Sequence, residues 1–168
     1  MDGGHVEVLL VVESWFGNTR TIADAIAQGL SQQGGRVQML NVEDALAEVP
    51  AGVDLVVLGA PTHNRGLSTT ATRQKAIAAG AKHGATGAQE WVDTVQLRDG
   101  VKVAVFDTVT SKSWFSGSAA KAAARTLARR GLAAAAETKS FTVRGLKGPL
   151  RPGQVNAAQS WGQHLARQ

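Results

Sequence analysis

Short apolar runs of strand length alternate with segments of helical period along the whole sequence, and this order limits the possible folds more than any other feature. Val6–Val12 and Asp54–Leu58 are β-branched runs of the kind that form buried strands. The segment between them repeats apolar residues at helical spacing and ends at Gly34-Gly35. Strands that alternate with helices imply a mostly parallel sheet with helices on both faces. The sequence therefore predicts a doubly wound α/β domain.

The expected elements follow from the same pattern. The predicted strands are residues 6–12, 36–40, 54–58, 101–106 and a segment within 132–143. The first predicted helix has Ile22, Ala23, Ile26 and Leu30 on one face, and Asn41 is expected to cap a short helical turn. Further helices are predicted at residues 68–80, 88–97, 116–130 and 152–168. The last of these is expected to bury Val155, Ala158, Trp161 and Leu165. A turn at residues 59–62 is expected to end the third strand, and the Gly/Pro-rich residues 145–153 to connect to the last helix. Residues 1–168 are expected to form a single domain.

Composition excludes several classes of protein. The 168 residues include no cysteine, which excludes disulfides and thiolate metal sites. His5, His83 and His164 show no ligand spacing, so we expect no metal site. No apolar run approaches the roughly 18 residues that span a membrane, and the N-terminus shows no secretory signal. The sequence therefore predicts a cytoplasmic protein without a membrane partner.

The net charge of +5 is unevenly distributed. Residues 1–97 contain 6 Lys/Arg and 10 Asp/Glu, whereas residues 98–168 contain 12 Lys/Arg and 3 Asp/Glu. A basic half could attract an acidic partner or a nucleic acid. The basic residues are dispersed and are not interleaved with aromatic residues, so a solvated basic surface is favoured over nucleic-acid binding.

The segment after the first strand has the chemistry of a phosphate site. In open parallel sheets, ligands bind beyond the carboxyl ends of the strands. Residues 13–19, Glu-Ser-Trp-Phe-Gly-Asn-Thr, open a helix, whose N-terminal N–H groups favour an anion. Ser14, Asn18 and Thr19 can add side-chain donors, and Gly17 permits close backbone approach. Neither a P-loop nor a G-x-G-x-x-G motif is present, which argues against a P-loop NTPase and a dinucleotide site.

This loop resembles the S/T-x-T-G-N-T phosphate loop of the flavodoxin family, with Phe16 in place of the usual hydroxyl residue. Residues 59–66 look like the family's loop on one side of the isoalloxazine ring, and residues 106–108, leading to Trp114 and Gly117, look like the loop on the other side. The resemblance implies a five-stranded sheet of order 2-1-3-4-5 and bound FMN. The residues it implies for FMN contact are Ser14, Trp15, Phe16, Gly17, Asn18, Thr19, Pro61, Thr62, His63, Asn64, Gly66, Asp107, Thr108, Trp114 and Gly117.

Aromatic residues in two of these loops support a flat aromatic ligand. Ser-Trp-Phe occurs at residues 14–16 and again at 113–115. Such rings could stack on a flavin, or they could pack onto the domain as local core. The chain has no tyrosine, so Trp114 or His63 would take the place of the family's stacking tyrosine.

Two other site chemistries fit the sequence poorly. Ser14, His63 and Asp107 follow three strands and could be interpreted as a hydrolase triad, but Ser14 lacks the G-x-S-x-G turn. A receiver domain would need a carboxylate at the end of the third strand, where residues 58–61 have none.

The function predicted from the resemblance is FMN-dependent electron transfer, with no catalytic side chain assigned. The partner would be a redox protein or a small redox substrate. Flavodoxin shuttles are acidic, whereas this chain has a sequence pI of about 10.1. Two alternatives therefore stay open, an FMN-dependent NAD(P)H:quinone-type reductase and a partner-binding module that has lost its flavin.

Overall fold

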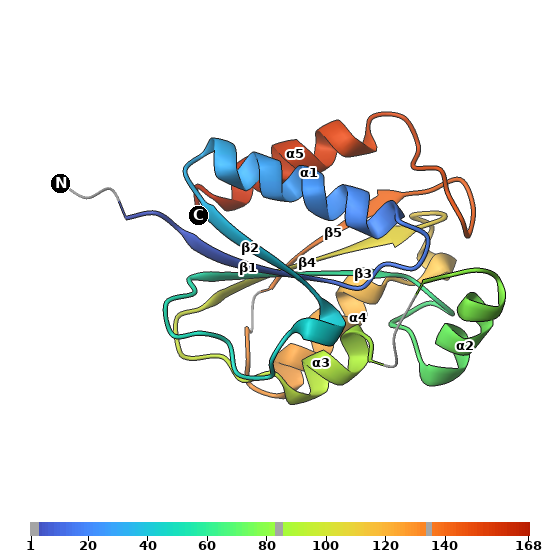
Figure 1. Cartoon of the computed structure of the whole chain (residues 1–168), viewed down its shortest axis with the longest axis horizontal. Coiled ribbons are helices and arrows are strands. Elements are labelled where there is room, and N and C mark those ends of the chain that lie inside the picture. The colour runs from blue at the N-terminus through green and yellow to red at the C-terminus, as the bar shows by residue number, and fades with distance from the viewer. Residues whose placement is uncertain (1–3, 83–85, 134–135) are drawn as a thin grey trace.

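The computed structural model describes residues 4–82, 86–133 and 136–168. Five parallel strands form one sheet of order β2-β1-β3-β4-β5, as the sequence predicts (Figure 1). The strands are β1 (Glu7–Val12), β2 (Arg36–Asn41), β3 (Leu55–Pro61), β4 (Lys102–Val109) and β5 (Glu137–Thr142). Their in-register parallel pairing brings all five carboxyl ends to one edge of the sheet.

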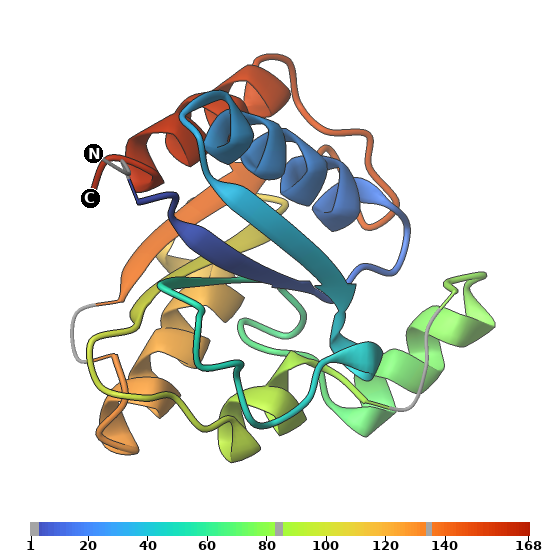
Figure 2. The same cartoon turned by 60° about the vertical axis from the view of Figure 1, so that its left-hand side comes forward.

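Helices cover both faces of the sheet. They are α1 (Asn18–Gln32), α2 (Thr70–Ala78), α3 (Ala88–Thr94), α4 (Ala119–Arg129) and α5 (Gln154–Leu165), with short 3-10 turns η1 (Val42–Asp44) and η2 (Trp114–Ser116). Helices α1 and α5 lie on one face and α3 and α4 on the other, while α2 extends beyond the sheet edge (Figures 1 and 2). No helix within the described ranges is long and apolar enough to cross a membrane.

Side chains of the central strands alternate between two apolar cores. Along β1, Val8 and Leu10 pack with α1 and α5, whereas Leu9 and Val11 pack with α3 and α4. All four are at most 3% exposed. The predicted buried positions of α1 and the predicted core roles of Trp91 and Trp161 are confirmed.

Several element boundaries differ from the sequence prediction. β3 does not end at Leu58 but continues to Pro61, because residues 59–61 pair in register with residues 106–108 of β4. α4 begins at Ala119 rather than Ser116, because Gly117 has a φ of 66° and Ser118 caps the helix by accepting from the Lys121 N–H.

Two side chains also differ from their expected roles. Val155 is 43% exposed and does not join the buried face of α5. Asn41 precedes η1, but its side chain does not cap that turn and instead accepts a hydrogen bond from Arg20. Both side chains are exposed, so neither difference changes the apolar cores.

Two glycines set the position of α1. A Cβ added to Gly29 would lie 2.0 Å from the carbonyl oxygen of Gln159 in α5, and one on Gly162 would lie 2.2 Å from the carbonyl oxygen of Ile26. The backbones of α1 and α5 are therefore in direct contact. This contact holds the N-terminus of α1 at the carboxyl edge of the sheet.

Glu137 makes part of the stability depend on pH. Burial raises the pKa of this carboxyl, but hydrogen bonds from Trp161 and Gln168 and the neighbouring His164 together hold the pKa below its ordinary value. The stabilisation is complete above the ordinary glutamate pKa of about 4.3 and is lost as the pH falls through the lowered value. We expect the free energy of unfolding of Glu137→Gln, measured by urea unfolding, to fall less at acidic pH than that of the unmodified protein. The same decrease at acidic pH in both proteins would contradict this role of Glu137.

Candidate functional site

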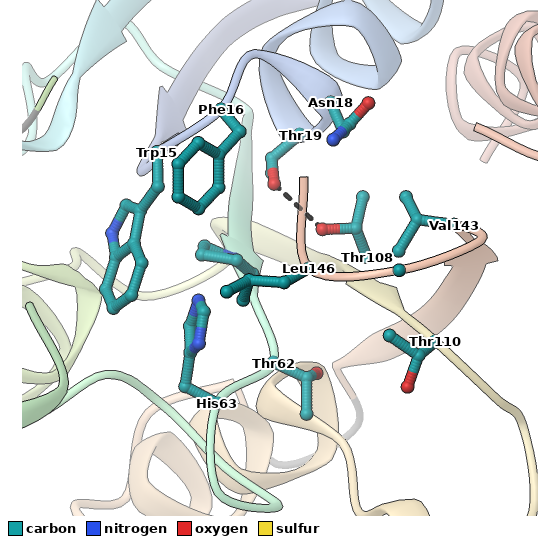
Figure 3. A pocket seen from close by; sticks show the side chains of 12 residues that line it. Trp15, Phe16, Asn18, Thr19, Thr62, His63, Thr108, Thr110, Val143 and Leu146 are labelled. Carbon is teal, nitrogen blue, oxygen red and sulfur yellow. Dashed lines mark hydrogen bonds between the residues drawn. The ribbon is translucent and has the colours of Figure 1, made fainter. Parts of the chain in front are cut away.

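Four loops meet at the carboxyl edge of the sheet: the first loop (residues 13–17), the second (62–69), the third (110–118) and the fourth (143–153). They enclose a cavity of about 50 Å³. Figure 3 shows the residues that line it, which are Trp15, Phe16, Asn18, Thr19, Pro61, Thr62, His63, Thr108, Thr110, Val143, Gly145 and Leu146. Eight of these twelve belong to the set predicted to contact FMN. The fold thus brings most of the predicted site to one place.

The N-terminus of α1 borders this cavity through Asn18 and Thr19. Gly17 precedes the helix with a φ of 92°, a conformation that favours glycine. Among the described residues, no protein acceptor bonds the backbone N–H groups of residues 16–19. The first turn also contains no acidic side chain. Unpaired amides at a helix N-terminus are suited to an anion.

Four threonines line the cavity: Thr19, Thr62, Thr108 and Thr110. The Thr19 and Thr108 hydroxyls lie 2.9 Å apart, and both residues are almost fully buried (Figure 3). Thr62 donates to the Asp107 carboxylate at 3.1 Å and accepts from the Ala119 N–H at 3.0 Å. The wall next to the α1 N-terminus is therefore polar but uncharged.

Asp107 is fully buried and does not line the cavity. Its Oδ2 accepts from the Thr62 hydroxyl, the Ser118 hydroxyl at 2.6 Å and the Ala120 N–H at 3.0 Å. Because these donors come from the second loop and from the start of α4, the carboxylate fixes both to the end of β4. We expect Asp107 to position Thr62.

Trp15 forms one wall of the cavity and is also a local core residue. The ring is 5% exposed and packs with Ala76 and Ala81. It stacks on His63 with ring centroids 3.7 Å apart and planes 16° from parallel (Figure 3). Its Nε1–H donates to Glu13 at 2.9 Å. The local-core interpretation of this ring is confirmed, whereas its contact with flavin stays a prediction.

A buried polar network supports the first loop from behind. Glu13 is 1% exposed, and its Oε1 accepts from the Ser68 hydroxyl at 3.0 Å and the Ala88 N–H at 2.6 Å. The same Ser68 hydroxyl accepts from Arg73, which is paired with Glu90. The sequence analysis gave Glu13 no role. Its position directly after β1, as a carboxylate beside an apolar strand, was the available signal.

The second loop contains a two-residue turn of unusual composition. His63 and Gly66 exchange backbone hydrogen bonds of 2.9 and 3.0 Å, and the two residues between them, Asn64 and Arg65, have φ angles of 46° and 69°. Positive φ at both central positions defines a type I′ turn, which prefers Asn-Gly. Arg65 therefore occupies a conformation that favours glycine.

The second and third loops touch each other. A Cβ added to Gly117 would lie 2.3 Å from the carbonyl oxygen of Arg65. This contact closes the space between the two loops. Of the predicted FMN-contact residues, Asn64, Gly66 and Gly117 do not line the cavity.

Two further predicted residues, Ser14 and Gly17, do not line the cavity. Ser14 and Gly17 line a separate hollow on another side of the first loop, and the Ser14 hydroxyl accepts from the Arg20 N–H at 3.2 Å. Trp114 begins η2, but its side chain lies outside the described part of the structure. The proposed contact of Trp114 with flavin stays a prediction.

The fourth loop is the part of the site that the sequence analysis missed. Val143, Gly145 and Leu146 line the cavity, although residues 145–153 were expected to serve only as a connector. A Cβ on Gly148 would lie 2.6 Å from the Asn18 side chain, so this loop lies against the start of α1. The rule that ligand sites form after strands was applied to three strands but not to the fifth.

Metal binding finds no support in the part of the chain that the structure describes. No group of three His, Asp or Glu side chains there could hold an ion. His5 bonds the Gly34 carbonyl, and His164 pairs with Glu137. His83 lies outside the described residues.

Part of the sequence matches a known protein family. Residues 9–74 match a family model described as a flavodoxin domain. The matched segment runs from β1 into α2, so it includes the first loop and the second loop but neither the third nor the fourth. No curated protein matches the sequence significantly.

Solved structures share the fold over almost the whole chain. Oxidised flavodoxin 1 from Bacillus cereus is 18% identical, with 96% of this chain and 97% of that chain covered and a TM-score of 0.68. Oxidised flavodoxin 2 from the same organism is 21% identical, with 96% and 99% covered and a TM-score of 0.66. Two-electron reduced flavodoxin from Megasphaera elsdenii is 18% identical, with 96% and 99% covered and a TM-score of 0.61. These likenesses show a flavodoxin-like fold.

Proposed function

Because the fold and the match over residues 9–74 together support assignment of the chain to the flavodoxin family, we propose that the protein binds FMN and carries out electron transfer. One observation carries the proposal. The cavity at the carboxyl edge of the sheet joins the N-terminus of α1, where the amides of residues 16–19 have no protein acceptor among the described residues, to four threonines, which is suitable chemistry for a phosphate and a polyol chain. The structural neighbours were solved in oxidised and two-electron reduced states, which fits a redox function.

The residues present fit the phosphate end of FMN as they stand, whereas the space for its ring is closed. The amides of residues 16–19 with Thr19 would hold the phosphate, and Thr62 and Thr108 would lie along the ribityl chain. The ring would lie between the second and third loops, which touch through Arg65 and Gly117. A cavity of about 50 Å³ is far below the roughly 300–1,000 Å³ of ordinary ligand sites. We therefore propose that these two loops separate when FMN binds.

When bound, FMN supplies the one- and two-electron chemistry, and the protein sets its potential through neighbouring groups. Trp15 and His63 would shield the ring from water, because they are already packed together at this edge. Asp107 would keep Thr62 oriented through the hydrogen bond between them. A redox partner protein or a small redox substrate in the cytoplasm would exchange electrons with the exposed part of the ring.

The phosphate site can be tested with Asn18→Asp, which adds a negative charge beside the amides of α1. We expect FMN to bind the unmodified protein at least tenfold more tightly than riboflavin, which lacks the phosphate, a difference of about 1.4 kcal/mol. Asn18→Asp should remove this difference without unfolding the protein, since an acidic residue in the first turn favours a helix. Titrations followed by tryptophan and flavin fluorescence measure both affinities.

Asn156→Asp is the matched control, because it makes the same chemical change in the first turn of α5, where the side chain is exposed. It should leave the affinities for FMN and riboflavin unchanged. Equal binding of FMN and riboflavin to the unmodified protein would contradict a phosphate site at α1. No binding of either flavin would instead favour the partner-binding module, which the small cavity also supports.

The reductase alternative is favoured by the basic carboxyl-terminal half of the chain, which suits an anionic reductant. Mixing the FMN-loaded protein with NAD(P)H without oxygen separates the two functions. Bleaching of the flavin within seconds would indicate a reductase, whereas an unchanged spectrum would indicate an electron carrier that needs a partner protein.

A further inference from the structure

A second, larger cavity lies beside the third loop, between α4 and β5. Its volume is about 520 Å³, and five cationic residues line it: Arg65, Lys112, Lys121, Arg125 and Lys139. They come from the second loop, the third loop, α4 and β5. The remaining lining residues are small, hydroxyl-bearing or apolar, and none is acidic. This basic cavity was not predicted from the sequence, where the positive charges looked dispersed.

The basic cavity is separate from the smaller cavity, although Arg65 and Gly117, between which the flavin ring is proposed to lie, both line the basic cavity. At the end of β4, Thr108 and Thr110 line the smaller cavity, whereas Val109 and Ser111 line the larger one. Successive side chains of a strand point to opposite faces, so the strand end divides the two spaces. The two cavities have no lining residue in common.

The charges of the basic cavity are not balanced by carboxylates. Within the described ranges, none of the five cations takes part in an ion pair. Asp107 is fully buried and bonds the lining residue Ser118, so it contributes one negative charge next to the five positive ones. Like charges gathered around one cavity repel each other, and an anionic ligand would relieve that repulsion.

The backbone of Arg65 gives a second, independent indication. Its φ of 69°, at a turn position that prefers glycine, is unfavourable for any larger side chain. Strained residues of this kind cluster at ligand sites. The Arg65 side chain lines the basic cavity, so a function there would explain why arginine occupies this position.

We propose that the basic cavity binds a small molecule that carries a pyrophosphate or several phosphate groups, at a site distinct from the cavity proposed to hold the FMN phosphate. Its volume lies within the range of ordinary small-molecule sites, about 300–1,000 Å³. Guanidinium and ammonium groups together with serine and threonine hydroxyls are the usual donors to phosphate oxygens. A free pyrophosphate and the diphosphate of a dinucleotide share this chemistry.

Calorimetric titration of the flavin-free chain with inorganic pyrophosphate and, separately, with NADPH at constant ionic strength tests the site. Arg125→Gln and Arg129→Gln form a matched pair, because both remove one positive charge from α4 and only Arg125 lines the cavity. We expect Arg125→Gln to weaken binding of pyrophosphate at least tenfold and Arg129→Gln to change it less than twofold. Equal effects of the two variants would show general charge attraction and overturn the proposal.

Arg65→Gly separates a ligand role from a structural one. Glycine suits the turn, so the variant should melt at a higher temperature and still bind pyrophosphate at least tenfold more weakly. Unchanged pyrophosphate binding by this variant would argue against the site. The α1 N-terminus could also hold a phosphate, and Asn18→Asp distinguishes binding there from binding in the basic cavity. It should leave pyrophosphate affinity unchanged, and a large loss would assign the binding to α1 and overturn the proposal.

A competition measurement distinguishes a free pyrophosphate ligand from a dinucleotide. Displacement of NADPH by pyrophosphate would place the dinucleotide's diphosphate in the basic cavity. Binding of pyrophosphate without any binding of NADPH would assign the cavity to a smaller phosphorylated ligand. Tight binding of polyglutamate without binding of pyrophosphate would indicate a docking surface for an acidic protein and would overturn the proposal.

Discussion

Replacing Glu13 with alanine is expected to lower the free energy of unfolding by about 3–5 kcal/mol. The carboxylate is 1% exposed and accepts hydrogen bonds from Trp15, Ser68 and the Ala88 N–H. Its removal would leave three buried donors without an acceptor and would open a void behind the first loop. Urea unfolding followed by tryptophan fluorescence measures the change.

Two further variants show whether this loss comes from the buried network. Glu13→Gln keeps an acceptor for Ser68 and Ala88 but turns an amide toward Trp15, so we expect a smaller loss than for alanine. Glu48→Ala removes an exposed carboxylate and should change the free energy of unfolding by less than about 0.5 kcal/mol. A loss for Glu13→Ala no larger than that for Glu48→Ala would show that the network contributes little.

Phe106→Ala is expected to destabilise the domain by about 3–5 kcal/mol, because the ring is fully buried. It meets Phe141 and Trp161 edge to face, with centroid distances of 6.1 and 6.3 Å. The ring also lies over Gly59, where an added Cβ would fall 2.1 Å from Cζ. Gly59→Ala alone should therefore cost about 1–3 kcal/mol through overpacking.

The double variant measures whether these two residues fill the same space. With the ring of Phe106 removed, the added methyl at Gly59 has room, so the combined loss should be smaller than the sum of the two single losses. We expect a coupling of about 0.5–3 kcal/mol. Additive losses would mean that the ring does not rest on Gly59.

The strand-helix order was predictable because it depends on local periodicity. The strand order 2-1-3-4-5 was implied by the resemblance to flavodoxins and is confirmed. Element ends were less predictable, because they depend on neighbours that are distant in sequence. β3 extends to Pro61 only because β4 pairs with it, and α4 starts late only because Gly117 turns the chain against Arg65.

The candidate site was predictable for residues that directly follow a strand, because their place at the sheet edge can be inferred from the sequence alone. Residues 15–19 and 61–63, which follow the predicted first and third strands, supply seven of the twelve lining residues. Roles that depend on tertiary contacts were not visible in the sequence. Asp107 was expected beside the ligand, yet it lies beneath the loops and binds Thr62 and Ser118. The basic cavity also requires the fold, because its five cations are spread over residues 65–139.

The end of β4 forms a common wall between the two cavities, with Thr108 on one side and Val109 on the other. A ligand in either cavity that displaces this strand end must change the free energy of binding in the other. Thermodynamic linkage then requires the effect to be mutual, so the factor by which one ligand alters the affinity for the second equals the factor in the reverse direction. Binding in one cavity would thus change the ligand affinity of the other cavity through a single peptide unit.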